Sequence, residues 1–292
     1  MTFSRPEKAD RLAIIAGSGF LPLHVAEAAR LHGEDPLIIA LTNEADRDWT
    51  AFEHVNLGIG NFRDISAAIR ARGVGRVVLS GAVRRRPDWR DIKPTFKSLA
   101  KVPAVLKTLL AGGDDAVLKM AIGLIEASGA RVIGVHDIVP ELLATVGPIG
   151  LGKPNADDER DIEAAEAAAL ALGHLDVGQG AVAVGGRVVA LEGAEGTDAM
   201  LERVARLKAD GRISSRKRGV LVKLCKPQQD IRADLPSIGP STVVLAQMAG
   251  LAGIAVEAGR SLVLEREELI AAADRAGLFV LGVDRAAFRG NL

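Results

Sequence analysis

The sequence of 292 residues contains no tyrosine, and aromatic residues of all kinds make up only 3% of it. Few side chains are therefore available to stack on nucleic-acid bases. Lysine plus arginine and aspartate plus glutamate both number 37, so the formal net charge is zero. General nucleic-acid-binding proteins normally carry a basic excess or a dense basic stripe. We therefore expect no nucleic acid among the partners.

The sequence also has only one cysteine, Cys225. No internal disulfide can form, which favours a reducing compartment. The first residues are charged and lack the apolar segment of a signal peptide, and no apolar run is long enough to span a bilayer. These absences predict a cytoplasmic protein. The mean hydropathy of +0.20 is high for that class, and either a buried parallel sheet or a lipid-contacting surface would explain it.

Several classes of catalytic site lack their signatures. The five histidines show no HxxxH or HxH spacing, so a zinc site is not predicted. No GxSxG motif occurs, and Cys225 lacks the sequence context of a nucleophile. Carboxylates acting with Mg²⁺ are then the best remaining route to hydrolysis.

Apolar runs alternate with helical stretches in the first half, which predicts a parallel sheet with helices on both faces. In the second half, two strands around Gly185-Gly186 indicate a hairpin and hence a mixed sheet. We expect an α/β protein with a Rossmann-like N-terminal domain at 1–145, a linker at 146–158, and a mixed α/β domain at 159–292 that carries the catalytic motif. Strands are expected at Leu12–Ala16, Leu37–Leu41, Arg76–Ser80, Arg131–Val135, Gly180–Leu191 (the hairpin), Gly219–Leu224, Ile254–Val256, Leu262–Leu264 and Leu278–Val283, and helices at His24–Leu31, Asp64–Ala71, Pro103–Ala111, Asp115–Ala127, Glu159–Leu172, Thr197–Lys208, Thr242–Ala249 and Glu267–Ala276.

The stretch Lys223–Gly239, KLCKPQQDIRADLPSIG, concentrates charged and polar residues around two prolines. Proline argues against a regular helix here. Because polar and apolar residues alternate, an extended chain would place Asp230, Arg232 and Asp234 on one face. A helical turn would also bring Asp230 and Asp234 together. Either geometry suits a hard metal ion and a phosphate, and the alternative is an amphipathic strand with a solvated charged face.

Gly17-Ser18-Gly19 lies between an expected strand and an expected helix, where backbone amides and a helix N-terminus can receive phosphate. A tight strand-to-helix turn is the alternative. A dinucleotide fingerprint would need a third glycine where Pro22 stands, and no acidic residue immediately follows the second strand. NAD is therefore poorly supported.

Two further groups lie near expected strand or helix ends. Arg84-Arg85-Arg86 follows Ser80-Gly81 at the carboxyl edge of a parallel strand, where ligands bind, although such a run is also typical of solvated surface. Asp114 and Asp115 open a helix, and they either cap it or contact metal or substrate.

The acidic residues Glu192, Glu195 and Asp198 gather around glycines at a strand-to-helix junction. Thr197 is the expected N-cap of the helix, and the acids would favour the helix start. The glycines would also let a ligand approach the backbone closely.

Five motifs together resemble one family. They are IAGSGFLP near the start, SGAVRRRP, GGDDAVL, LEGAEGTDAML, and the most specific, VKLCKPQQDIRADLPSIGPST. The family is the UDP-2,3-diacylglucosamine pyrophosphatases of lipid A biosynthesis, in the class unrelated to the metallophosphoesterases. The resemblance covers nearly the whole chain in order. Cys225 departs from the pattern, since a small residue other than cysteine is expected there.

The resemblance implies Mg²⁺-dependent hydrolysis of UDP-2,3-diacylglucosamine to 2,3-diacylglucosamine 1-phosphate (lipid X) and UMP. It implies two domains with the substrate between them, and peripheral contact with the cytoplasmic face of the inner membrane of a Gram-negative cell. The oligomeric state, including whether the chain forms a homodimer, is left undecided by the sequence.

This chemistry suits the residues already singled out. A Mg²⁺ ion on the phosphates needs only one or two protein carboxylates, and we assign it to Asp230 and Asp234. Lys223, Lys226 or Arg232 would stabilise phosphate charge, and Gln229 would position water or a phosphate oxygen. The catalytic set is thus Asp230, Asp234, Gln229, Lys223 and Arg232, and the expected substrate-binding residues are Gly17, Ser18, Gly19, Leu21, Ser80, Gly81, Arg84, Asp114, Asp115, Glu195, Gly196, Thr197, Asp198 and Lys226.

Two other functions compete with this one. A Rossmann-like nucleotide-sugar oxidoreductase or transferase would bind a cofactor at Gly17–Gly19. A non-catalytic nucleotide-lipid binding protein would bind the same lipid and leave it unchanged.

Overall fold

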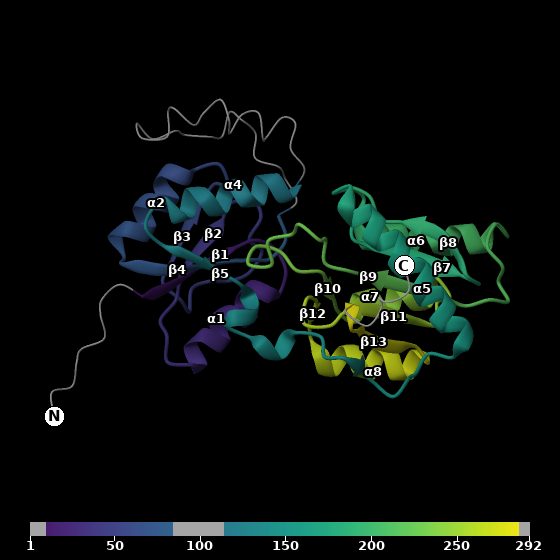
Figure 1. The fold of residues 1–292 in the computed structure, drawn as a ribbon. Coiled ribbons are helices and arrows are strands. Elements are labelled where there is room, and N and C mark those ends of the chain that lie inside the picture. Colours follow the sequence, from purple (N-terminus) through teal and green to yellow (C-terminus); the bar gives the residue numbers. More distant parts are fainter. Residues whose placement is uncertain (1–9, 84–113, 286–292) are drawn as a thin grey trace. The chain divides into compact units, whose positions relative to one another are not determined.

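The computed structural model describes residues 10–83 and 114–285, without the side chains of residues 114 and 115. These residues form two compact units (Figure 1). The first unit is Met1–Pro140 with Asp230–Asp234, and the second is Glu141–Gln229 with Leu235–Leu292. Both units have the α/β architecture expected from the sequence.

The first unit is built on a parallel sheet of five strands in the order β3-β2-β1-β4-β5. The bounds are β1 Arg11–Ala16, β2 Leu37–Leu41, β3 His54–Leu57, β4 Val74–Ser80 and β5 Arg131–Ile133. Helices α1 (Leu21–Leu31), α2 (Phe62–Ala71) and α4 (Asp114–Glu126) connect and cover the strands. A parallel sheet with covering helices is therefore confirmed.

Both faces of this sheet are buried because its central strands are largely apolar. Alternate residues of β1 point to opposite faces, so Ala13 and Ile15 pack against Ile65 of α2 and Ile122 of α4. Helix α1 contacts β1 and β4, and Figure 1 shows it on the opposite face from α2 and α4. The loops at the carboxyl ends of β1 and β4 are thereby left at one edge of the sheet.

The second unit contains a mixed sheet of six strands in the order β6-β13-β11-β9-β7-β8. Strands β9, β11 and β13 are parallel, whereas β6, β7 and β8 pair antiparallel with their neighbours. The bounds are β6 Gly147–Pro148, β7 Gly180–Val184, β8 Arg187–Leu191, β9 Gly219–Lys223, β11 Gly253–Glu257 and β13 Phe279–Val283, with a separate pair β10 Ser237–Ile238 and β12 Leu262–Val263. The expected hairpin is confirmed, and both of its glycines have positive φ.

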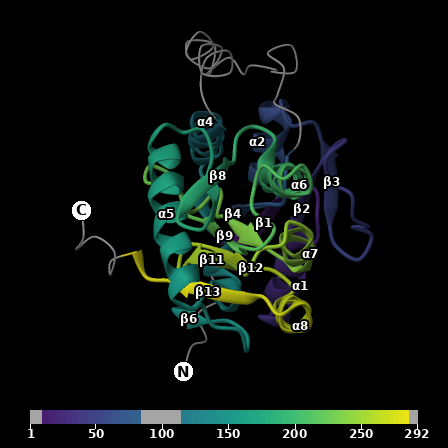
Figure 2. The same cartoon turned by 90° about the vertical axis from the view of Figure 1, so that its right-hand side faces the viewer.

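One long helix covers one face of this sheet and three helices cover the other (Figure 2). Helix α5 (Ala156–His174) packs Ile162, Ala165 and Ala169 onto one face. Helices α6 (Gly196–Ala209), α7 (Pro240–Met248) and α8 (Arg266–Ala276) pack the opposite face around Met200 and Leu269. No helix among the described residues is both long and apolar enough to cross a membrane.

The expected helices and strands that lie among the described residues are found with small shifts at their ends, and a few differences remain. Strand β3 has no expected counterpart, because this four-residue edge strand alternates exposed polar residues with half-buried apolar ones and contains no apolar run. The chain after β5 turns into a 3-10 helix at Val135–Asp137 instead of continuing as strand. The expected linker at 146–158 contains β6 and the first residues of α5. The helix expected at Pro103–Ala111 lies outside the described residues.

Candidate functional site

The segment after β9 is tied down at several points within the second unit. Lys223 is buried, and its Nζ donates to the carbonyl of Ser237 at 3.0 Å. The Nζ of Lys226 donates to Asp176 at 2.6 Å. The side-chain oxygen of Gln229 accepts the backbone N–H of Lys226 at 3.0 Å, so this glutamine holds the loop closed.

A buried ion pair holds the backbone of Cys225. Glu257, the last residue of β11, is 3% exposed, and its Oε2 accepts the Cys225 N–H at 3.0 Å. The Nη1 of Arg285 lies 3.6 Å from the same carboxylate and donates to the Cys225 carbonyl at 3.5 Å. Both backbone polar groups of Cys225 are thus bound by one charge pair, five residues before Asp230.

Residues Asp230–Asp234 form a single helical turn that belongs to the first unit. The N–H groups of Ala233 and Asp234 donate to the Asp230 carbonyl at 2.9 and 3.3 Å. Of the two conformations that the sequence left open, the structure has the turn and not the extended strand. Pro236 stops the turn from lengthening, and Ala233 packs against the core of the first unit.

Arg232 binds Asp230 and also ties this turn to its unit. Its Nε donates to Asp230 Oδ1 at 3.0 Å and its Nη2 to Oδ2 at 2.7 Å. Its Nη1 donates to Glu126 of α4 at 2.9 Å and to the Val132 carbonyl of β5 at 3.5 Å. Four of the five guanidinium hydrogens are thereby used within the first unit.

The carboxyl group of Asp230 is held in its ionised form. Its hydrogen bonds from the Arg232 side chain lower its pKa, and desolvation, the second largest effect, opposes this. The Arg232 backbone N–H and the positive charge of Lys119 lower the pKa further. Asp230 is thus a carboxylate at neutral pH. A cation bound at Asp230 would share this carboxylate with Arg232.

The glycine loops of the first unit pack against each other after β1 and β4. Gly17 N–H donates to the Ser80 carbonyl at 2.8 Å, and Ser18 exchanges backbone hydrogen bonds with Ala82. A Cβ on Gly17 would lie 2.4 Å from the Ala82 carbonyl oxygen, which is why glycine is required there. The Oγ of Ser80 is buried with no hydrogen-bond partner among the described residues. It is the only buried side-chain polar atom in the described parts of these two loops that lacks a partner.

A protein carboxylate already occupies the loop amide expected to bind phosphate. Gly19 N–H donates to Oδ1 of Asp46 at 3.0 Å, and Gly19 has a positive φ of 95°. Leu21 is the first residue of α1, as expected for a helix beginning at this loop. A phosphate bound at this amide would have to displace Asp46.

The junction between β8 and α6 lies at the same edge of its sheet as Lys223. Gly180 is the register partner of Lys223, and Glu192 N–H donates to the Gly180 carbonyl. Glu192 is buried, with Oε2 unpartnered among the described residues. Its other oxygen accepts the hydroxyl of Thr197 at 2.9 Å, so the expected N-cap role of Thr197 is wrong and Glu195 occupies that position.

The remaining predicted residues at this junction and in the first unit have fewer interactions. Glu195 pairs with Arg203 at 3.1 Å, Gly196 has a positive φ, and Asp198 is exposed in the first turn of α6. Asp114 and Asp115 begin α4, as expected for a helix start. Arg84 lies outside the described residues.

Among the described residues, no three histidine, cysteine, aspartate or glutamate side chains gather as metal ligands. Asp230 and Asp234 nevertheless fit Mg²⁺, because this ion takes one or two carboxylates and completes its shell with water and phosphate oxygens. Oδ2 of Asp230 accepts one donor and keeps a second lone pair. Asp234 follows one helical turn later and is exposed.

Sequence reasoning missed Glu257, Glu126 and Lys119. The only signal for Glu257 was that it directly follows the apolar strand expected at Ile254–Val256; its strand lies parallel to that of Lys223 in the structure. Glu126 and Lys119 had no signal, since they lie on α4, far from Asp230 in the chain, and only the tertiary fold brings them to it.

Comparison with known proteins matches both halves of the chain. Residues 11–142 match the family model described as LpxI N-terminal domain, and residues 145–281 match LpxI C-terminal domain. A protein of Caulobacter vibrioides named UDP-2,3-diacylglucosamine pyrophosphatase LpxI is 42% identical over 275 residues, which cover 94% of this chain and 98% of that protein.

Among solved structures, the NAD complex of UDP-glucose 4-epimerase from Thermus thermophilus aligns with 94% of this chain and 86% of its own. Its identity is 14% and its TM-score 0.30, too low to support any inference about function.

Proposed function

The chain belongs to the LpxI family, and from this premise we propose that it hydrolyses UDP-2,3-diacylglucosamine to lipid X and UMP with Mg²⁺. It is a hydrolase of a pyrophosphate bond, with the UDP-2,3-diacylglucosamine pyrophosphatase activity that serves lipid A synthesis. The products, the metal and a peripheral position at the inner membrane are the finer parts of the proposal.

The ionised Asp230, paired through both oxygens with Arg232, is the observation that best supports this chemistry. A carboxylate fixed by a fork of two hydrogen bonds cannot rotate away, so its free lone pair keeps one direction. Such a group can orient a water molecule or bind a cation beside a phosphate. We assign it the main catalytic role.

Asp230 and Asp234 would hold Mg²⁺, which when bound supplies charge neutralisation on the pyrophosphate. Lys226 and Gln229 act on the loop itself, because their side chains bind Asp176 and the Lys226 N–H respectively. The backbone conformation between Lys223 and Asp230 is thereby fixed before substrate arrives. Arg232 would stabilise the ionised state of Asp230 rather than carry the phosphate alone.

The test is release of UMP from UDP-2,3-diacylglucosamine with purified protein and Mg²⁺. Asp230→Asn removes the charge and keeps the shape, and we expect kcat to fall about a thousandfold, the scale of losing a positioned acid–base or electrostatic group. Glu126→Gln is the matched control, since it changes the other acidic partner of Arg232 in the same way and leaves Asp230 charged. Equal kcat in Asp230→Asn and wild type would refute the assignment.

Chelation with EDTA should abolish UMP release, and added Mg²⁺ should restore it. Full activity in chelator would remove the metal from the proposal. Recovery of unchanged substrate from a stable complex would favour a binding protein. Binding of NAD(P) in calorimetry would favour an oxidoreductase.

A further inference from the structure

A polar cavity of about 360 Å³ lies within the second unit, away from the catalytic motif. Arg218, Ala252 and Phe279 line it, and these residues lie at the amino ends of β9, β11 and β13. Lys223 ends β9 at the opposite edge, roughly 15 Å along the strand at about 3.3 Å per residue. The cavity therefore belongs to a different edge of the sheet from the proposed catalytic residues.

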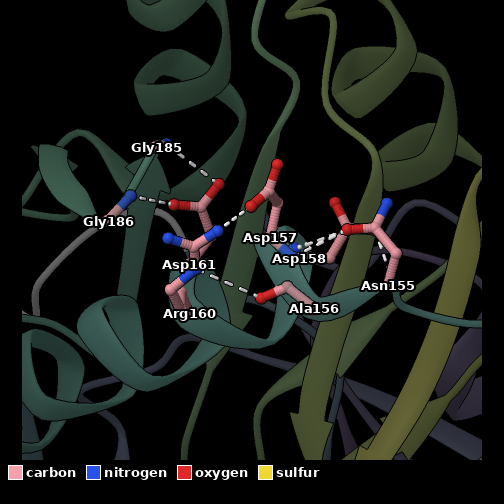
Figure 3. Close-up of polar contacts among 8 residues, drawn as sticks. All are labelled: Asn155, Ala156, Asp157, Asp158, Arg160, Asp161, Gly185 and Gly186. Carbon is pink, nitrogen blue, oxygen red and sulfur yellow. Dashed lines mark hydrogen bonds and ion pairs between the residues drawn. The ribbon is translucent and has the colours of Figure 1, made fainter.

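Each carboxylate of the cavity has at least one partner among neighbouring groups (Figure 3). Both oxygens of Asp161 accept backbone N–H groups, from Gly185 at 3.0 Å and from Gly186 at 2.5 Å. Asp158 accepts the Asn155 N–H at 3.0 Å, and Asp157 pairs with Arg160. The Asn155 side chain caps the start of α5 by accepting the Asp157 and Asp158 N–H groups, so these two amides are not open to a ligand.

Three of its cations, by contrast, have no such partner. Among the residues that the structure describes, the side chains of Lys153, Arg216 and Lys217 form no hydrogen bond or ion pair. All three line the cavity and are exposed. A cavity whose acids have partners and whose cations are unpaired favours a negatively charged ligand.

Two neighbouring cations hold the loop that presents this charge. Arg218 donates to the carbonyls of Leu251 and Gly277 at 2.8 and 3.2 Å. The Nζ of Lys208 donates to the carbonyls of Lys217 and Gly250 at 3.1 and 2.7 Å. The backbone at residues 217 and 218 is therefore anchored on both sides, which positions Lys217 and its neighbour Arg216 over the cavity.

We propose that this cavity is a binding site for a phosphate group, held by Lys153, Arg216 and Lys217. A guanidinium fork and two ammonium groups match the several oxygens of a phosphate, and the largely polar lining excludes an apolar ligand. The phosphate comes either from a soluble phosphate ester or from the headgroup of an anionic lipid. The site is independent of whether the chain hydrolyses UDP-2,3-diacylglucosamine.

The test uses the whole ¹⁵N-labelled protein and inorganic phosphate as the probe. We expect saturable shifts of the Gly185 and Gly186 amide signals, and Arg216→Ala with Lys217→Ala should weaken this binding about tenfold or more. The matched control, Arg206→Ala with Arg212→Ala, removes the same charge from exposed positions that do not line the cavity. Shifts confined to amides around Lys226 would place phosphate at the catalytic edge and overturn the proposal.

Sedimentation with phosphatidylglycerol and phosphatidylcholine vesicles distinguishes the two sources of phosphate. Binding to phosphatidylglycerol that is lost in the Arg216/Lys217 double variant and kept in the control identifies a lipid headgroup. Vesicle binding unchanged by the double variant, with weakened binding of inorganic phosphate, identifies a soluble phosphate ester. Amide shifts that are not saturable, or that are equal in the double variant and wild type, overturn the site.

Discussion

Removal of Glu257 is expected to destabilise the protein and to lower activity without touching Asp230. The carboxylate is 3% exposed, accepts the Cys225 N–H, and lies 3.6 and 3.8 Å from Arg285 and Arg260. Breaking a buried ion pair costs about 3–5 kcal/mol. Both ion-pair distances exceed those of a good hydrogen bond, and Arg260 is 36% exposed. We therefore expect only about 2 kcal/mol for Glu257→Gln, which keeps an acceptor for Cys225.

Glu257→Ala also leaves the Cys225 N–H unpaired in a buried position, which adds about 1–3 kcal/mol. The expected order of stability is therefore wild type, then Glu257→Gln, then Glu257→Ala, with the last about 3–4 kcal/mol below wild type. The assay is urea unfolding with comparison of the transition midpoints at equal slopes. Glu202→Gln and Glu202→Ala, at an exposed position of α6, serve as controls.

Activity measured well below the unfolding transition gives a second readout. The backbone of Cys225 leads into the loop before Asp230. Loss of the hydrogen bond from the Cys225 N–H should therefore reduce kcat more than it changes KM. Glu257→Gln should recover most of the kcat that Glu257→Ala loses. Equal destabilisation by Glu257→Gln and Glu257→Ala would refute the role of the Cys225 hydrogen bond. If the Glu257 variants are as stable as the Glu202 controls, the contacts of Glu257 with Cys225 and Arg285 do not stabilise the protein.

Three further predictions concern other parts of the chain. Gly17→Ala should lower the free energy of unfolding by about 1–3 kcal/mol, because its Cβ would lie 2.4 Å from the Ala82 oxygen; thermal denaturation checks this, and a wild-type midpoint would contradict it. Burial is the main cause that raises the pKa of Glu166, with Glu257 and Glu163 raising it further and Arg285 opposing. The folded state then binds more protons than the unfolded chain, so this group's contribution to stability falls as pH rises from about 4.5 through the folded pKa. Glu166→Gln should abolish that fall in pH-dependent urea unfolding, and an unchanged slope would contradict it. Arg232→Ala should speed hydrogen exchange at the Ala233 and Asp234 amides, since Arg232 ties their turn to Glu126 and Val132; unchanged exchange would show that packing alone holds the turn.

The sequence by itself determined the fold class and most of the elements. Runs such as LIIAL at Leu37–Leu41 are apolar at every position, and only a sheet covered on both faces buries such a strand. The glycine pair at Gly185-Gly186 determined the hairpin, because both positions need positive φ. The motif letters of Lys223–Gly239 were enough to single out this stretch as the predicted catalytic segment, which stays a prediction. Local chemistry and chain neighbours specify each of these features.

The tertiary structure decided how the motif is held. Alternation in the sequence allowed a strand or a turn at Asp230–Asp234, and packing of Ala233 with the contacts of Arg232 to α4 and β5 selected the turn. The sequence likewise could not show that Asp46 occupies the Gly19 amide or that Glu257 binds the Cys225 backbone. These partners are separated by 27 and 32 residues. Their meeting depends on sheet register and helix packing, which no local pattern contains.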